Sequence, residues 1–177
     1  ILKNFSHHKR AVSVKNYPIV SNFSIGGEDR RRGKKVFSLI YIGGLDEIRG
    51  ITQIVRALEF INSNDKLKLT LCGDFYPAHY ERKVRSLEGF KKVQYLGWLE
   101  SRDIPNLLET HDAGIICLHP IRNYVTSLPL KLFEYMAAGL PVIASNFPLW
   151  KKIIEDQRCG ICVDPLKLDE IARAIIY

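Results

Sequence analysis

The sequence predicts an open, doubly wound α/β fold, in which a parallel sheet is covered by helices on both faces. Short apolar runs alternate with longer amphipathic stretches from residue 36 to the end of the 177 residues. The runs are almost continuously apolar, as expected for strands buried on both faces of a sheet. The chain has the length of one domain, and its composition of 46% apolar and 25% charged residues is ordinary for a globular protein.

The elements follow one another as six strands and six helices. Strands are predicted at 36–42, 67–72, 93–96, 113–118, 141–144 and 160–163, where the apolar runs lie. Helices are predicted at 51–61, 78–87, 101–108, 130–138, 149–155 and from 167 onward. The first helix has apolar residues at helical spacing, Ser101 is a predicted N-cap, and Gly139 ends the fourth helix. Because such sheets bind ligands beyond the carboxyl ends of their strands, we expect the site in the loops after residues 42, 72, 96, 118 and 144.

Residues 1–35 lack steady periodicity and are expected to be a lead-in or interdomain linker, with the folded domain over 36–177. The net charge of +7 and pI near 9.3 admit nucleic acid, an anionic membrane or a phosphorylated ligand as partners. Much of the excess lies in a basic cluster at 30–35, which is more typical of a solvated loop than of a nucleic-acid-binding arm. We therefore expect no nucleic-acid partner.

Cysteine usage predicts a reducing compartment. Cys72 and Cys117 lie in apolar runs and are expected to pack in the core. Cys159 and Cys162 have the spacing of a redox or zinc motif, but no second pair accompanies them, and a packing role is favoured. With no signal peptide, disulfide framework or apolar run of membrane-spanning length, a cytoplasmic protein is expected.

The loop after the first predicted strand has the outline of an anion site. Gly43 and Gly44 allow close approach of backbone to a ligand, and the loop is expected to lead straight into a helix whose N-terminus favours negative charge. Arg49, expected at that helix start, could grip a phosphate with two hydrogen bonds. A tight turn with a solvated arginine is the alternative. The loop is neither a dinucleotide fingerprint nor a P-loop.

The segment from Thr126 to Ile143 predicts a second anion site. Pro129 suits the first turn of a helix, where its missing N–H costs nothing. Lys131 lies near that N-terminus, where the helix dipole disfavours a cation by up to about 1 kcal/mol unless an anion is present. Glu134 lies on the same helical face in an apolar setting and needs polar partners, such as the hydroxyls of a ribose. A simple surface ion pair between Lys131 and Glu134 is the alternative.

At this point the chain resembles a known family. The string from Lys131 to Ser145 is similar to the most characteristic motif of group 1 glycosyltransferases, the family 4 enzymes of the GT-B fold. Four further motifs occur in the family's order: Tyr41-Ile42-Gly43-Gly44 with Arg49-Gly50, Leu71-Cys72-Gly73-Asp74, Tyr95-Leu96-Gly97-Trp98, and Cys159 to Pro165. The resemblance covers residues from about 36 to the end of the chain.

The resemblance implies the C-terminal, Rossmann-like half of a two-domain enzyme, which binds a nucleotide-diphosphate sugar. By position, Glu134 corresponds to the residue that binds the ribose hydroxyls, and Arg49 to a basic residue on the diphosphate. The backbone amides of Ser127, Leu128, Pro129 and Leu130 correspond to the loop that faces phosphate and sugar, although Pro129 has no N–H to give. Tyr95 to Gly97 falls where the family places the base.

Two positions depart from the family. An arginine often follows the first loop glycine, where this chain has Gly44, so diphosphate binding would depend more on Arg49 and Lys131. A sugar-facing glutamate often lies eight residues before Glu134, where this chain has Thr126.

The resemblance further implies retaining transfer to an acceptor held by an N-terminal domain, with a bacterial surface polysaccharide favoured by the Ser-Leu-Pro-x-Lys-Leu-Phe-Glu-Tyr string. The donor is the only ligand expected: no cofactor and no metal site are predicted, and no catalytic residue is assigned. The positive charge suits peripheral contact with an anionic membrane at its inner face. A catalytically inactive nucleotide-binding or regulatory module is the alternative function.

Overall fold

The described part of the computed structural model, residues 16–23, 36–62 and 66–177, contains a six-stranded parallel sheet. The strands are β1 (Phe37–Ile42), β2 (Leu67–Cys72), β3 (Val93–Gly97), β4 (Ala113–Ile116), β5 (Val142–Ser145) and β6 (Gly160–Val163). Their order is β3-β2-β1-β4-β5-β6, and every neighbouring pair is parallel. The predicted doubly wound sheet is confirmed, and its order reverses between β1 and β4, the point where such sheets bind ligands.

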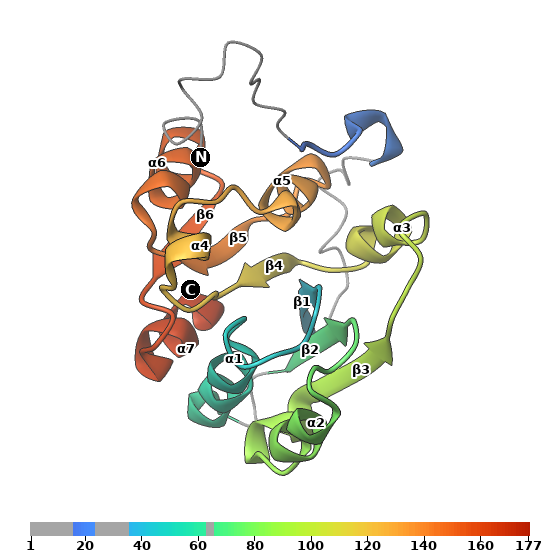
Figure 1. Ribbon diagram of the computed structural model, residues 1–177, viewed down its shortest axis with the longest axis vertical. Helices are drawn as coiled ribbons and strands as arrows, with labels where there is room; N and C mark the ends of the chain where they lie inside the picture. Colours follow the sequence, from blue (N-terminus) through green and yellow to red (C-terminus); the bar gives the residue numbers. More distant parts are fainter. Residues whose placement is uncertain (1–15, 24–35, 63–65) are drawn as a thin grey trace, which may run out of the picture.

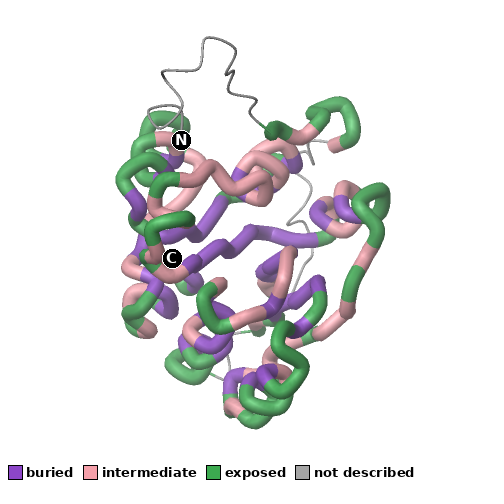
Figure 2. The backbone as a smooth tube through the Cα atoms, in the orientation of Figure 1, coloured by how far each residue is buried: buried purple, intermediate pink, exposed green. Residues whose placement is uncertain are grey.

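Helices cover both faces of the sheet (Figure 1). They are α1 (Ile51–Ala57), α2 (Ala78–Arg85), α3 (Ile104–Glu109), α4 (Arg122–Val125), α5 (Leu130–Ala137), α6 (Pro148–Gln157) and α7 (Leu168–Ile176). One core joins α1, α2 and α7 to Leu39 and Tyr41 of β1, and a second joins α3, α5 and α6 to Ile40 and Ile42. Successive side chains of a strand point to opposite faces, so β1 contributes to both cores and lies buried in the middle (Figure 2).

Several predicted boundaries were wrong for identifiable reasons. The helix expected at Ser101 begins at Ile104, with Asp103 as N-cap and Ser101 in the preceding turn. The strand expected to reach residue 118 ends at Ile116, because the chain beyond it leaves the sheet ladder: the Ser145 hydroxyl, at the end of β5, donates to the Leu118 carbonyl, and the His119 amide donates to the Ile48 carbonyl in the loop after β1. The single turn of α4 and the 3₁₀ turn at Glu88–Lys92 were not predicted, since such short pieces leave little periodicity. The helix predicted at 51–61 is α-helical only to Ala57 and continues as a 3₁₀ turn at Leu58–Phe60.

Part of the expected lead-in contacts the domain. Val20–Asn22 form a 3₁₀ turn, and the Tyr17 ring meets the edge of Phe133 on α5 with centroids 4.9 Å apart. Phe23 packs, partly buried, against the core that α3, α5 and α6 share. The basic cluster at 30–35 lies outside the described residues, and the division into a linker and a domain stays a prediction.

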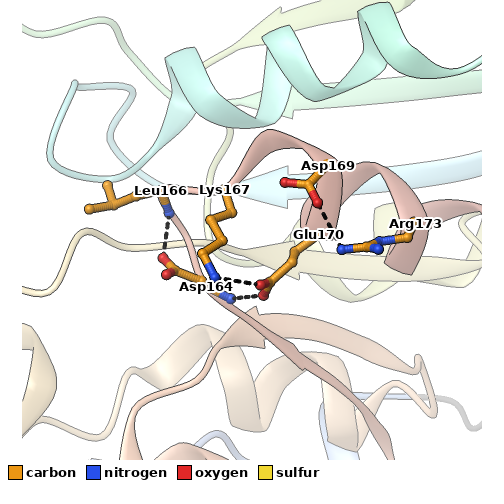
Figure 3. A network of polar contacts seen from close by, with 6 residues as sticks. All are labelled: Asp164, Leu166, Lys167, Asp169, Glu170 and Arg173. Atoms are coloured by element: carbon orange, nitrogen blue, oxygen red, sulfur yellow. Dashed lines mark hydrogen bonds and ion pairs between the residues drawn. The ribbon is translucent and has the colours of Figure 1, made fainter.

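A polar network fixes the start of α7 (Figure 3). The Asp164 amide donates to Glu170 Oε2 at 2.9 Å, and Lys167 Nζ donates to Oε1 of the same carboxylate at 3.0 Å. The backbone bond from Asp164 and the bond from Lys167 together lower the pKa of Glu170. The Leu166 amide donates to Asp164 Oδ1, which closes the turn between β6 and α7. These contacts explain why the motif ending at Pro165 leads directly into a helix.

The four cysteines are free thiols. Cys72 and Cys117 are buried, and Cys159 and Cys162 pack partly buried against the core beside α6. Burial raises the pKa of Cys162 to about 11, so this thiol stays protonated at neutral pH. The side chains therefore serve the packing role predicted for them.

No helix in the described ranges is long and apolar enough to cross a membrane.

One buried hydrogen bond ties α5 to the end of β1. The Ile42 amide lies beyond the register that pairs β1 with β4, and it donates to the Tyr135 hydroxyl at 3.0 Å. Tyr135 is fully buried, and its ring fills the space over Gly114, where an added Cβ would lie 2.4 Å from Cδ2 of the ring. This contact holds α5 against the strand whose loop forms the site described below.

Replacing Tyr135 by phenylalanine is expected to lower the free energy of unfolding by about 1–3 kcal/mol, because the buried Ile42 amide loses its acceptor. Urea denaturation of both proteins measures the change. The matched control is Tyr76→Phe, which removes a hydroxyl from a ring that is 76% exposed and should leave stability unchanged. Equal stability of the Tyr135 variant and the wild type would show that the bond contributes nothing.

Candidate functional site

The carboxyl ends of β1, β2 and β3 and the start of α5 enclose a cavity of about 290 Å³, called here the strand-end cavity. Its lining is Ile42, Gly43, Gly44, Cys72, Gly73, Asp74, Trp98, Leu99, Ser101, Ile104 and Lys131. Three residues predicted from the sequence, Gly43, Gly44 and Lys131, therefore share one space. The cavity lies at the sheet edge where the topology predicts a ligand.

The glycine loop leads into α1, which begins at Ile51 as predicted, but the helix start is not the open anion site that was expected. Leu45 pairs with Phe75 in a parallel bridge, and a turn follows before the helix. The Gly43 amide donates to the Cys72 carbonyl within the sheet. The start of α1 is buried, and its Thr52 amide donates to the Tyr80 hydroxyl at 3.0 Å. The N-terminus of α1 is consequently not open to an anion.

Arg49 is the basic residue of this loop. It lies one residue before Gly50, the N-cap of α1, and its guanidinium folds back over Gly43 and Gly44. The side chain is 39% exposed, and its Nε lies 3.2 Å from Asp46 Oδ2. Partial burial alone would lower the pKa of Arg49, but Tyr41, Tyr124 and Asp46 outweigh it and the pKa is raised. A permanent positive charge therefore stands beside the cavity.

The start of α5 brings Lys131 and Glu134 together. Pro129 is the N-cap, and the amides of Leu130 and Lys131 open the helix with no acceptor earlier in it. Lys131 Nζ lies 2.8 Å from Glu134 Oε2, and the two side chains are 28% and 12% exposed. Apart from this ammonium, Oε2 has no donor among the described residues. The ion pair of the alternative prediction is thus present, although both side chains are less exposed than in an ordinary surface pair.

The loop before α5 is anchored from behind by α6. Trp150 is fully buried, and its Nε1 donates to the Ser127 carbonyl at 2.6 Å. The Ser127 hydroxyl donates to the Tyr124 carbonyl, and Thr126 Oγ1 donates to the Arg122 carbonyl from an exposed position at the end of α4. Leu128 follows as a half-buried residue. The predicted loop is thus held on two sides while its backbone leads to the helix start.

The third predicted segment divides between the two faces of the sheet. The Tyr95 ring packs against Phe75, with centroids 5.2 Å apart, and lies beneath the Arg85 guanidinium. It belongs to the core on the α1 side and does not line the strand-end cavity. Gly97 has a left-handed backbone with φ of 72° and open space around it, and the next residue, Trp98, lines the cavity.

His119 lies close behind the glycine loop. Its amide donates to the Ile48 carbonyl, and its Nε2 is buried without a partner in the described structure. Burial lowers the pKa of His119, against the raising effect of Glu47 and Asp46. Within the described ranges, no group of three or more His, Cys, Asp or Glu side chains is placed to hold a metal ion.

A larger cavity, of about 560 Å³, lies at the opposite edge of the sheet, between the amino ends of the strands and α7. Its walls are mostly aliphatic, including Phe37, Val142 and Ile175. Volume alone would favour it, but ligands of doubly wound sheets bind at the carboxyl edge, where the charged groups are. The strand-end cavity is therefore the candidate site.

Two residues that shape the site were missed from the sequence. Asp46 holds Arg49, and a carboxylate three residues before an arginine in a turn is a usable signal. Trp150 anchors the loop before α5 from 23 residues away. No local pattern indicates so distant a contact.

The comparisons with known proteins identify the family of the chain. A family model described as glycosyl transferases group 1 matches residues 36–177. The chain belongs to this family. The resemblance drawn from the ordered motifs is confirmed, and with it the Rossmann-like domain of a GT-B glycosyltransferase.

Three similar proteins place this glycosyltransferase domain among named enzymes. Chitobiosyldiphosphodolichol beta-mannosyltransferase of Kluyveromyces lactis is 33% identical over 85 residues, or 46% of this chain and 18% of that protein. O-antigen chain mannosyltransferase B of Escherichia coli is 23% identical over 143 residues, or 77% of this chain and 35% of that protein. The structure of HepE of Anabaena, in complex with UDP and glucose, has a TM-score of 0.69 and 19% identity, with 92% of this chain and 45% of that chain covered. The chain thus spans less than half the length of each.

Proposed function

We propose that this chain is the donor domain of a glycosyltransferase and binds a nucleotide-diphosphate sugar in the strand-end cavity. The ribose would lie on Glu134 and the diphosphate between Arg49, Lys131 and the first amides of α5. The base would lie near Gly97 and Trp98, where it would contact the backbone and not the Tyr95 ring. The UDP bound in the Anabaena structure supports a nucleotide as the ligand class.

The observation that carries the proposal is the largely buried carboxylate of Glu134. Its side chain is 12% exposed, and Lys131 Nζ is the ion-pair partner of its Oε2 at 2.8 Å. A carboxylate can accept about four hydrogen bonds, so a single ammonium leaves acceptor capacity unused in an apolar setting, where unpaired lone pairs are costly. The vicinal hydroxyls of a ribose are donors that this carboxylate can accept from.

The charges around the cavity suit the departure of a nucleoside diphosphate. As the glycosidic bond breaks, negative charge grows on the leaving diphosphate and must be stabilised. Arg49 and Lys131 are fixed by Asp46 and Glu134 respectively, so they need little reorganisation as that charge develops. This domain would then supply the electrostatic part of the catalysis, and an N-terminal domain would supply the acceptor.

Sugar, acceptor and stereochemistry extend the proposal. Both named relatives transfer mannose, which supports a mannose donor, and the O-antigen relative supports a bacterial surface-polysaccharide acceptor. A net charge of +7 supports work at an anionic membrane surface. Retaining transfer is proposed from the family. Because Thr126 stands where the family often has a sugar-facing glutamate, the anomeric configuration of the product must be measured to test it.

Calorimetric titration with UDP, GDP and ADP tests donor binding. At least one of the three is expected to give saturable heat with a single site and to raise the melting temperature of the chain. The chain by itself should show no sugar transfer, because the acceptor domain is proposed to be separate. Absence of heat and of any thermal shift with all three nucleotides would contradict the proposal.

A catalytically inactive nucleotide-binding module is the second candidate, motivated by Gly44 and Thr126 in place of the family's charged residues. The full-length gene product separates the two. Sugar transfer by that protein, abolished by Glu134→Ala, would exclude the inactive module. Nucleotide binding without transfer to any tested acceptor would favour it.

A further inference from the structure

Asp46 accepts two hydrogen bonds from Arg49. Its Oδ1 accepts the backbone N–H of Arg49 at 2.8 Å, and its Oδ2 accepts Nε of the guanidinium at 3.2 Å. The first bond closes the turn before α1, and the second fixes the direction of the side chain. One carboxylate thus sets both the backbone and the head group of the basic residue proposed to bind the diphosphate.

These two hydrogen bonds place the Arg49 guanidinium over the glycine loop. A Cβ built on Gly43 would lie 3.4 Å from Nη1 of Arg49, and one built on Gly44 would lie 3.5 Å from Nε. The loop backbone below is itself fixed, because the Tyr41 hydroxyl donates to the Gly44 carbonyl at 3.0 Å. The guanidinium therefore occupies the space beside Gly44 that a longer side chain at this position would need.

The placement of a carboxylate here has an electrostatic cost. Asp46 is only 22% exposed, and a negative charge next to an anion site weakens anion binding by repulsion. A long arginine side chain at 39% exposure would otherwise lose rotamer freedom when it binds a ligand. Holding the guanidinium in advance can outweigh the repulsion.

We infer that Asp46 is a positioning residue, which orients the Arg49 guanidinium toward the diphosphate. This rests on the proposed function, since it assumes that Arg49 binds the diphosphate. The two possible roles of Asp46 predict opposite signs. If it only caps the turn and repels the ligand, removing its charge strengthens nucleotide binding; if it positions Arg49, removing its charge weakens it.

The test is the dissociation constant of the chain for whichever of UDP, GDP and ADP binds most tightly. Asp46→Asn keeps an oxygen for the Arg49 amide but loses the charged contact with Nε, and should raise the dissociation constant about three- to tenfold. Asp46→Ser, which can also cap the turn but is too short to reach the guanidinium, should do the same. The control is Glu47→Gln, which removes the same charge at the next residue. The Glu47 side chain is 53% exposed and pairs with Lys83, so this variant should leave binding unchanged.

A double-mutant cycle locates the effect. Lysine in place of Arg49 keeps the charge but lacks the planar head group, so adding Asp46→Asn to Arg49→Lys should change affinity by less than about twofold. Unchanged or tighter binding by both Asp46 variants would overturn the inference, as would the same loss in the Arg49→Lys background. Wild-type chain that binds none of the three nucleotides would instead overturn the proposed function, and the inference with it.

Discussion

Replacing Glu134 by alanine is expected to weaken nucleoside diphosphate binding roughly tenfold to a hundredfold, the value of one or two hydrogen bonds to a charged group. Stability should fall as well, because the variant leaves the partly buried Lys131 ammonium without its carboxylate partner. Calorimetric titration and urea denaturation of the same preparation measure the two quantities.

The control for Glu134 is Glu155→Ala on α6. Glu155 is 62% exposed and pairs with Lys151 across one helical turn, so its removal deletes a similar pair far from the cavity. It should alter neither affinity nor stability. If Glu134→Ala bound the nucleotide as tightly as wild type, the assignment of the ribose to this carboxylate would be wrong.

Replacing Gly50 by alanine is expected to destabilise the chain by more than about 3 kcal/mol. Gly50 has a left-handed backbone with φ of 75°, and an added Cβ would lie 1.9 Å from the Cys117 carbonyl oxygen. The added Cβ and the carbonyl oxygen are both attached directly to the backbone. The clash can therefore be relieved only if the loop after β1 and the end of β4 move apart. The melting temperature and the denaturation midpoint should both fall.

Gly97→Ala separates strain from crowding. Gly97 has nearly the same backbone, with φ of 72°, but no atom lies within 4 Å of an added Cβ. It should cost only the backbone term of about 1–2 kcal/mol. Equal losses at the two positions would contradict the close approach of Gly50 to Cys117.

Much of the fold was predictable because the strands are nearly pure apolar runs. β1, β2 and β6 lie within one residue of their predicted ends, since apolar residues predominate in each of them, although polar residues such as Lys68 of β2 also occur. Elements fixed by tertiary contacts were harder. The predicted strand at 113–118 overran β4 because Cys117 and Leu118 are apolar, yet the ladder with β5 ends at Ile116, and the Leu118 carbonyl accepts a side-chain hydroxyl, that of Ser145.

The candidate site was predictable where charge conflicts with its setting. Lys131 at a helix start and Glu134 in an apolar helix both stood out for this reason, and the structure places them 2.8 Å apart beside a cavity. The helix after Gly44 begins at residue 51 as predicted, but its N-terminus is not an open anion site, because tertiary contacts that the sequence does not reveal bury it, and the Thr52 amide donates to the Tyr80 hydroxyl. Tyr95 was expected at the site by position, but its side chain points to the other face.

The most direct test of the central claim is a crystal structure of this chain with the nucleoside diphosphate that binds in the titration. We predict the ribose hydroxyls within hydrogen-bond distance of Glu134, and the diphosphate between Arg49 and the first turn of α5. A nucleotide bound in the larger cavity beside α7, with the strand-end cavity empty, would contradict the account.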